Sequence, residues 1–189
     1  MKKSLILALA SLLLVAGCAR SEARLKIAGT DIAALAKASD VIVVGTVLGE
    51  GAVRNIARDP NDLSREHPTL KVLAQEYRVA VESSLKGIAT GPIVVTVARW
   101  DQQVGFDPTP VEAFLPLDTN ARYLLFLRRH PYDPSLLAIA FEPSRFKLGS
   151  QAVVQSPWGP AATAFPPRDA TAFVADVRRA IATEVLGGH

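Results

Sequence analysis

Apolar residues recur with a period of two over most of residues 40–155, and this alternation constrains the fold more than any other feature of the chain. Successive side chains of a β-strand point to opposite faces, so a half-buried strand alternates apolar and polar residues. Six such runs follow one another with little helical pattern between them: DVIVVGTVLGE, QEYRVAVES, PIVVTVARW, ARYLLFLRR, SLLAIAFE and RFKLGSQAVVQ. Short strands at close spacing are typical of a barrel or sandwich, so we expect a mainly β (α+β) fold with antiparallel pairing.

Individual runs predict how each strand is buried. Residues 40–50 are apolar at nearly every position, which predicts a strand buried on both faces, and Gly45 predicts a bend or bulge within it. The second run predicts a strand with one exposed face. Its two sets of side chains are Tyr77, Val79 and Val81 on one side and Glu76, Arg78 and Glu82 on the other. Gly149 and Ser150 fit the turn of a two-residue hairpin.

Two segments with helical periodicity flank the strands. Thr30 or Asp31 can cap a short helix, and after a proline-rich linker Asp169 can cap a longer one that ends near Leu186. The apolar positions are Ile32, Leu35 and Ala36 in the first helix, and Phe173, Val174, Val177, Ile181 and Val185 in the second. We expect the second, amphipathic helix to pack on the barrel. The alternative is a helix that lies on a partner or a membrane surface, but the stripe lacks the tryptophan and dense lysine of a bilayer-surface helix.

The chain opens with a targeting signal. Lys2 and Lys3 precede an apolar run from Ser4 to Ala16, which is the layout of a secretory signal peptide. This run is shorter than the ~20 residues of a spanning helix. Against a core helix of the folded domain, its apolar residues cover every helical face and leave no polar side to meet water. Its end, LVAGC, resembles the lipobox of bacterial lipoproteins. The resemblance implies cleavage before Cys18 and a thioether-linked diacylglycerol on that cysteine.

The lipobox resemblance divides the chain and places it in the cell. Residues 1–17 are expected to be the signal peptide, 18–29 a lipidated tether, 30–160 the barrel domain, and 161–189 the linker and C-terminal helix. Two or more acyl chains make a stable anchor, so we expect attachment to a membrane of the bacterial cell envelope without a span. Ala19, in place of aspartate, favours the outer membrane facing the periplasm in a Gram-negative host. In any other host we expect the outer face of the plasma membrane.

Charge and cysteine content exclude several classes of protein. The chain has 21 Lys and Arg against 18 Asp and Glu, and removal of Lys2 and Lys3 leaves 19 against 18. This balance gives no electrostatic footprint for nucleic acid. The single cysteine, Cys18, rules out an internal disulfide. The sequence has no G-x-S-x-G, H-E-x-x-H, P-loop or G-x-G-x-x-G motif, so we expect no enzymatic activity and no cofactor beyond the covalent acyl chains.

The strand order resembles that of bacterial secreted domains related to the TIMP/netrin-like group. The resemblance covers Asp40 to Leu148 and is carried by SDVIVVGTV, YRVAVESSLKG, IVVTV, ARYLLFL and SRFKL, in that order. It implies an OB-like five-stranded β-barrel, closed or partly open, with flanking helices. Metalloproteinase inhibitors of this group chelate zinc through the free amine and carbonyl of an N-terminal cysteine. Acylation of Cys18 would remove that amine, so the resemblance supports the fold and not the inhibitory mechanism.

Two long polar connections form the candidate binding surface. Residues 51–70 hold Arg54, Asp59, Asp62 and His67, and residues 100–120 hold Trp100, Asp101 and Phe106. Loops on a rigid barrel often carry recognition residues, and a tryptophan can stack a sugar or a base. The spacing of Asp59, Asn61 and Asp62 lacks the pattern of a calcium loop, so we expect no metal site.

These features together predict a non-enzymatic binding or interaction module whose partner is an envelope protein or polymer. Two alternatives stay open. A small envelope hydrolase would use His67 or His130 with a carboxylate such as Asp101 or Asp133. A structural or assembly lipoprotein would dock through the C-terminal helix. Both His67 and His130 precede a proline, which favours solvated loop positions for the two histidines.

Overall fold

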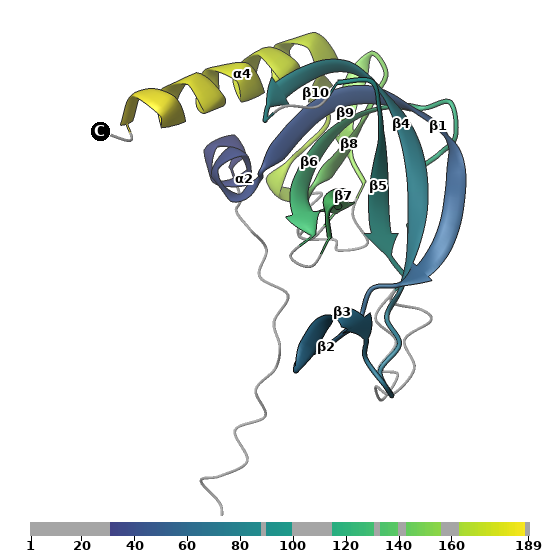
Figure 1. Cartoon of the computed structure of the whole chain (residues 1–189). Helices are drawn as coiled ribbons and strands as arrows, with labels where there is room; N and C mark the ends of the chain where they lie inside the picture. Colours follow the sequence, from purple (N-terminus) through teal and green to yellow (C-terminus); the bar gives the residue numbers. More distant parts are fainter. Residues whose placement is uncertain are drawn as a thin grey trace, which may run out of the picture.

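The computed structural model describes residues 31–87, 90–99, 115–130, 133–139, 143–155 and 163–187 (Figure 1). These residues form one large sheet, a small two-stranded sheet and the helices α2 and α4, which confirms the mainly β prediction. The helices are α2 (Ile32–Ala38) and α4 (Ala170–Gly187). The strands are β1 (Val41–Asn55), β2 (Arg58–Asp59), β3 (Asp62–Glu66), β4 (Leu73–Lys86), β5 (Pro92–Ala98), β6 (Arg122–His130), β7 (Asp133–Ile139), β8 (Arg145–Leu148), β9 (Gln151–Val154) and β10 (Arg168–Asp169).

The pairings of the large sheet lead back to the strand at which they begin. β1 pairs with β4, β4 with β5, β5 with β7, β7 with β6, and β6 again with β1. The strands β8, β9 and β10 extend the sheet beyond β6. The β5–β7 pair is parallel, so the sheet is mixed and the prediction of purely antiparallel pairing is wrong. The reason is topological: β7 reaches β5 only after the chain has passed through β6, and such a long connection permits a parallel neighbour.

β1 and β6 are buried on both faces along much of their length, as the sequence predicted for β1. One face contributes to a sheet cluster made of strand residues and Leu117, and the other to a helix cluster beneath α2 and α4. The sheet cluster comprises Val41, Val43, Val47, Tyr77, Val79, Val95, Val97, Leu117, Tyr123, Leu125, Leu127 and Leu137. The helix cluster comprises Leu35, Ala36, Ile42, Val44, Leu124, Phe126, Phe146, Leu148, Ala152, Phe165, Ala170, Phe173 and Val177.

Gly45 allows two strands to approach closely. The register between β1 and β4 shifts between Val44 and Gly45. A Cβ atom at Gly45 would lie 2.5 Å from the carbonyl oxygen of Ala80 and 2.8 Å from Cγ1 of Val79. These distances leave no room for a side chain at this position. The predicted bend or bulge at this position is confirmed.

Both helices begin at the predicted caps. The Oδ1 atom of Asp31 accepts a hydrogen bond from the backbone N–H of Ala34 at 2.7 Å, and Asp169 accepts one from Ala172 at the same distance. A side-chain acceptor at the N-cap satisfies a donor that has no partner within the helix. The sequence therefore places the start of each helix correctly.

α4 packs its apolar stripe against the sheet. Phe173 and Val177 are fully buried, and the Phe173 ring lies 4.7 Å from that of Phe146, between centroids. α4 also lies beside α2, as Figure 1 shows in yellow and purple. Within the ranges given above, neither helix is long and apolar enough to cross a membrane.

Candidate functional site

The connection between β1 and β4 folds as the β2–β3 hairpin, which stands off the large sheet at the end away from α4 (Figure 1). Four predicted surface residues lie on or beside it: Arg54 in β1, Asp59 in β2, Asp62 in β3 and His67 after β3. All five β3 side chains are exposed. We call residues 54–67 the hairpin surface. The other predicted residues, Trp100, Asp101 and Phe106, lie outside the described residues.

Asp59 and Asp62 stabilise the turns of the hairpin itself. The Oδ1 atom of Asp59 accepts from the backbone N–H of Asn61 at 2.8 Å. Asp62 accepts from the N–H of Ser64 at 3.1 Å and from its hydroxyl at 2.6 Å. Such Asx turns hold an aspartate to its own backbone. No group of three or more His, Cys, Asp or Glu that could hold a metal occurs in the described part of the chain.

His67 closes the turn that leads into β4. Its Nδ1 atom accepts from the backbone N–H of Leu70 at 2.9 Å and from that of Thr69 at 3.3 Å. A neutral imidazole has one donor and one acceptor, so these contacts place the ring proton on Nε2. The Nδ1 atom is therefore a structural acceptor, and acid–base work by that atom would break the turn.

Asn55, which sequence reasoning missed, ties the two ends of the hairpin together. Its Oδ1 atom accepts from the backbone N–H groups of Ala57 at 3.1 Å and Val72 at 3.0 Å. Its Nδ2 atom donates to the Glu66 carboxylate at 3.1 Å. One amide thus holds the start, the end and the return strand of the hairpin in place. An asparagine at the end of an apolar strand is the signal that could have indicated such a clamp.

Arg54 pairs with a buried carboxylate, that of Glu76. The alternating pattern of this strand had predicted that Glu76 faces solvent. Glu76 is only 8% exposed and forms an ion pair with Arg54. A Cβ atom on Gly51 would lie 3.1 Å from the Cβ of Glu76. Because glycine has no side chain, β1 can lie close over Glu76. The Nε2 atom of Gln75 also donates to the carbonyl of Gly51 at 2.9 Å. The prediction that Glu76 faces solvent is therefore wrong, because β1 crosses over it.

His130 occupies a strand and not a solvated loop, so that prediction is also wrong. β6 continues through Arg128 and Arg129, which pair with β7, and His130 ends the strand at 7% exposure. His130 is the register partner of Asp133. The Cα atoms of directly opposed residues in an antiparallel pair lie roughly 4.5–5.5 Å apart. The backbone therefore brings together His130 and Asp133, one of the histidine–carboxylate combinations considered for a hydrolase.

A polar network that the sequence did not predict joins β6, β8 and the end of β9. The Tyr123 hydroxyl donates to Oε1 of Gln155 at 2.9 Å and accepts from the backbone N–H of Asp118 at 3.1 Å. The Asp118 carboxylate accepts from Nζ of Lys147 at 2.8 Å. This hydrogen bond holds the pKa of Asp118 below its ordinary value and raises the pKa of Lys147, while burial raises the pKa of Tyr123.

Two further buried polar groups lie near this network. Arg145 is 3% exposed, and its guanidinium donates to the backbone carbonyls of Gln155, at 2.8 Å, and Leu115. Tyr77 is fully buried, and its hydroxyl makes no well-formed hydrogen bond to any described residue. Burial raises the pKa of Tyr77 to about 12, and the Glu50 charge adds to the rise.

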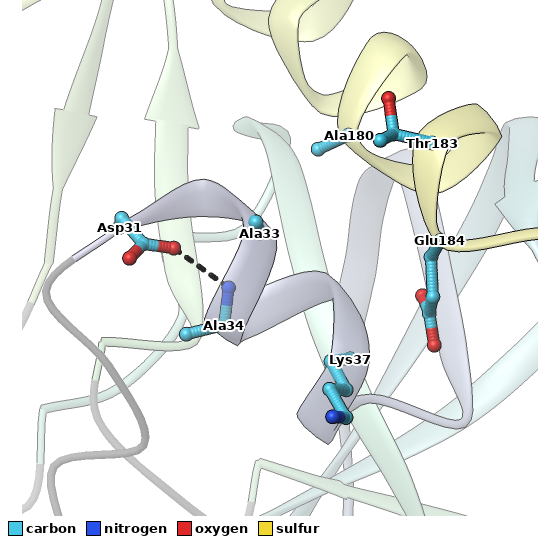
Figure 2. A pocket seen from close by; sticks show the side chains of 7 residues that line it. All are labelled: Asp31, Ala33, Ala34, Lys37, Ala180, Thr183 and Glu184. Atoms are coloured by element: carbon cyan, nitrogen blue, oxygen red, sulfur yellow. Dashed lines mark hydrogen bonds between the residues drawn. The ribbon is translucent and has the colours of Figure 1, made fainter. Parts of the chain in front are cut away.

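A groove of about 700 Å³ separates α2 from α4, and no sequence motif indicated it (Figure 2). Its lining residues are Asp31, Ala33, Ala34 and Lys37 on the α2 side and Ala180, Thr183 and Glu184 on α4. Asp31 also borders a second hollow of about 460 Å³. The described surface therefore has two features that can make contacts: the hairpin surface at one end and this groove at the other.

No protein-family model and no curated protein matches this chain. Neither the hairpin surface nor the groove collects a set of groups suited to metal binding, and most of the polar side chains of the hairpin serve its own turns.

Proposed function

We propose that this protein is a bacterial envelope lipoprotein, anchored through acyl chains on Cys18, whose mature domain is a non-enzymatic binding module. We further propose that the domain is an OB-like barrel made of β1, β4, β5, β6 and β7. The return of the pairings to β1 supports this reading. The OB-fold binds its ligands over its second and third strands and the loop between the first and second. In this chain those elements are β4, β5 and the β2–β3 hairpin.

The observation that carries the proposal is the form of the hairpin surface. The hairpin occupies the connection between the first and second strands, and it is held by its Asx turns, by His67 and by Asn55. It nevertheless exposes Leu63 at 45%. A rigid loop that displays an apolar side chain among polar ones loses little entropy on binding, which favours a contact surface.

Charges on the hairpin surface support a protein partner over a uniformly charged polymer. Basic and acidic side chains alternate over a short stretch: Arg58, Asp59, Asp62, Arg65 and Glu66. Complementary patterns of mixed sign give specificity in protein–protein contacts. We propose an envelope protein as the partner.

Photocrosslinking in the native envelope tests this proposal. A photoreactive residue at Leu63 on β3 is expected to give one discrete adduct. The matched control is Val153 on β9, which has a similar exposure of 41% but lies outside the hairpin surface. The Arg65→Glu substitution should weaken the adduct because it reverses a charge beside Leu63. Adducts of equal yield from both probe positions, or none from Leu63, would contradict a binding role for the hairpin.

A small hydrolase is the second candidate because β6 and β7 set His130 opposite Asp133. General acid–base work needs a histidine and a carboxylate within hydrogen-bond reach. A hydrolase would turn over envelope esters, peptides or glycans and would lose that turnover in the Asp133→Asn variant. If the protein is a binding module, neither the native chain nor the Asp133→Asn variant should show turnover.

Docking through α4, the assembly alternative, has less support. Phe173 and Val177 are occupied by the helix cluster, so the apolar stripe of α4 is covered by its own domain. The side of α4 that lines the groove is a surface with apolar character.

A further inference from the structure

We propose that residues 23–28 of the tether fold back into the groove between α2 and α4, so that part of the tether belongs to the folded domain. The groove is hollow at about 700 Å³ and has mostly apolar walls. Concave sites of this volume are places where proteins can bind another group or segment. The segment that directly precedes Asp31 is close enough in sequence to cover the groove.

Chain continuity places that segment at the mouth of the groove. Asp31 borders the groove, and its carboxylate is fixed by the cap hydrogen bond to Ala34 (Figure 2). Gly29 lies two residues before Asp31 and can adopt the left-handed conformations that reverse a chain. The seven residues of α2 span roughly 10 Å and six extended residues span roughly 20 Å, so residues 23–28 are long enough to run along the whole α2 side of the groove.

Residues 23–28 also match the groove in chemistry. Ala33, Ala34 and Ala180 are small, so they leave room for larger apolar side chains (Figure 2). The segment ARLKIA alternates, and an extended chain would turn Leu25 and Ile27 to one side.

The basic side chains of the segment alternate with its apolar ones. Arg24 and Lys26 would then lie on the outer side of an extended chain, toward the rim of the groove. That rim carries the carboxylates of Asp31, which caps α2, and Glu184, which pairs with Lys86, beside one base, Lys37. An extended segment would therefore keep Arg24 and Lys26 in water at the rim and leave Leu25 and Ile27 for the groove.

An intramolecular contact of this kind needs little affinity. A segment joined to its groove by two residues has an effective concentration in the millimolar range or above, so a weak intrinsic interaction suffices to fill the groove. Docking would shorten the reach from Cys18 to the domain from roughly 43 Å over thirteen residues to roughly 17 Å over the five that stay outside the groove. The docking itself does not depend on lipidation, so it can fail or succeed independently of the proposed function.

Crosslinking of introduced cysteines in the full chain, purified from membranes in detergent, tests the docking. The pair Ile27→Cys and Ala180→Cys should react with a short bismaleimide, and mass spectrometry should find the link within one chain. The matched control replaces Ala180→Cys by Arg178→Cys, because Arg178 is exposed on the same helix but does not line the groove. We expect a yield about tenfold higher for position 180, as the high effective concentration of a docked segment implies.

Equal yields at positions 180 and 178, or links found only between chains, would overturn the proposal. The second of these results would identify another copy as the occupant of the groove. Amide exchange gives an independent readout, because residues 24–28 should be protected in the native chain and exchange several-fold faster in the Ala180→Leu variant, whose larger side chain projects into the groove. Fast exchange of these amides in the native chain would also overturn the proposal.

Discussion

Lys86 forms an ion pair with Glu184, with 3.0 Å between Nζ and Oε2, and the same ammonium donates to the carbonyl of Ala36 at 2.7 Å. One side chain at the end of β4 therefore joins the last turn of α2 to α4. Lys86→Met keeps the aliphatic stem and removes both contacts, so we expect a loss of about 1–2 kcal/mol in the free energy of unfolding. Glu184→Gln leaves the bond to Ala36 and should cost less than about 1 kcal/mol.

Urea unfolding followed by circular dichroism measures both variants. Equal losses for Lys86→Met and Glu184→Gln would show that the carbonyl contact of Lys86 contributes nothing. An unchanged midpoint in Lys86→Met would contradict the role of this residue in holding the two helices together.

Phe173 is the residue through which α4 is expected to contribute most to stability. It is fully buried and contacts the ring of Phe146, so Phe173→Ala leaves a cavity in the helix cluster. We expect a loss of about 3–5 kcal/mol, measured by urea unfolding. The control is Arg179→Ala on the exposed side of α4, which should change stability by less than about 0.5 kcal/mol. A small effect of Phe173→Ala would mean that α4 is held loosely.

Two buried tyrosines should respond in opposite ways to loss of their hydroxyl groups. Tyr123→Phe breaks the bonds to Asp118 and Gln155 and should cost about 1–2 kcal/mol at neutral pH. The Tyr77 hydroxyl has no well-formed bond to a described residue, so Tyr77→Phe should be neutral or stabilising. Urea unfolding of the two variants, each against the native chain, makes the comparison. A larger loss for Tyr77→Phe than for Tyr123→Phe would contradict this assignment.

The same Tyr77 hydroxyl predicts a loss of stability in alkali. Its pKa is raised from 10.0 to about 12 in the folded state, so the folded chain holds the proton more tightly than the unfolded chain. The resulting stability is fully present below pH 10 and is lost as the pH rises toward 12. Unfolding midpoints measured across this range should fall less steeply in Tyr77→Phe than in the native chain. Parallel curves would contradict the burial of this group.

Asp118 predicts the opposite dependence, in acid. Its hydrogen bond with Lys147 lowers the pKa of the carboxyl in the folded state. The stabilisation is therefore present above the ordinary pKa of aspartate, near 3.9, and is lost as the pH falls through the lower folded value. Because both side chains are about half exposed, the effect should be small and should weaken in salt. Asp118→Asn should flatten the acid limb of stability against pH, and an unchanged limb would contradict the pairing.

Local signals predicted the elements well. The apolar run of residues 40–50 predicted the burial of both faces of β1, and Asp31 and Asp169 located the two helix starts. The hairpin turn at Gly149–Ser150 joins β8 to β9 as expected. Each of these features is determined by neighbours within a few residues, which is the range over which sequence patterns carry information.

Features that depend on distant parts of the chain were missed. Glu76 follows the polar side of an alternating strand, and only the passage of Gly51 over it explains its burial. The parallel β5–β7 pair and the burial of His130 depend on which strands become neighbours, which periodicity does not reveal. The network of Tyr123 joins residues about thirty positions apart. The groove between α2 and α4 arises from the packing of two helices at opposite ends of the chain.

The proposed lipidation of Cys18 would decide where this domain works, and mass spectrometry of the native protein tests that proposal most directly. The N-terminal peptide of protein extracted from the membrane fraction should begin at Cys18 and carry the mass of a diacylglycerol on its sulfur. The Cys18→Ser variant should keep residues 1–17 because the nucleophile for lipid transfer is gone. A native chain that begins at Met1, or that carries an unmodified Cys18 thiol, would contradict the lipoprotein assignment.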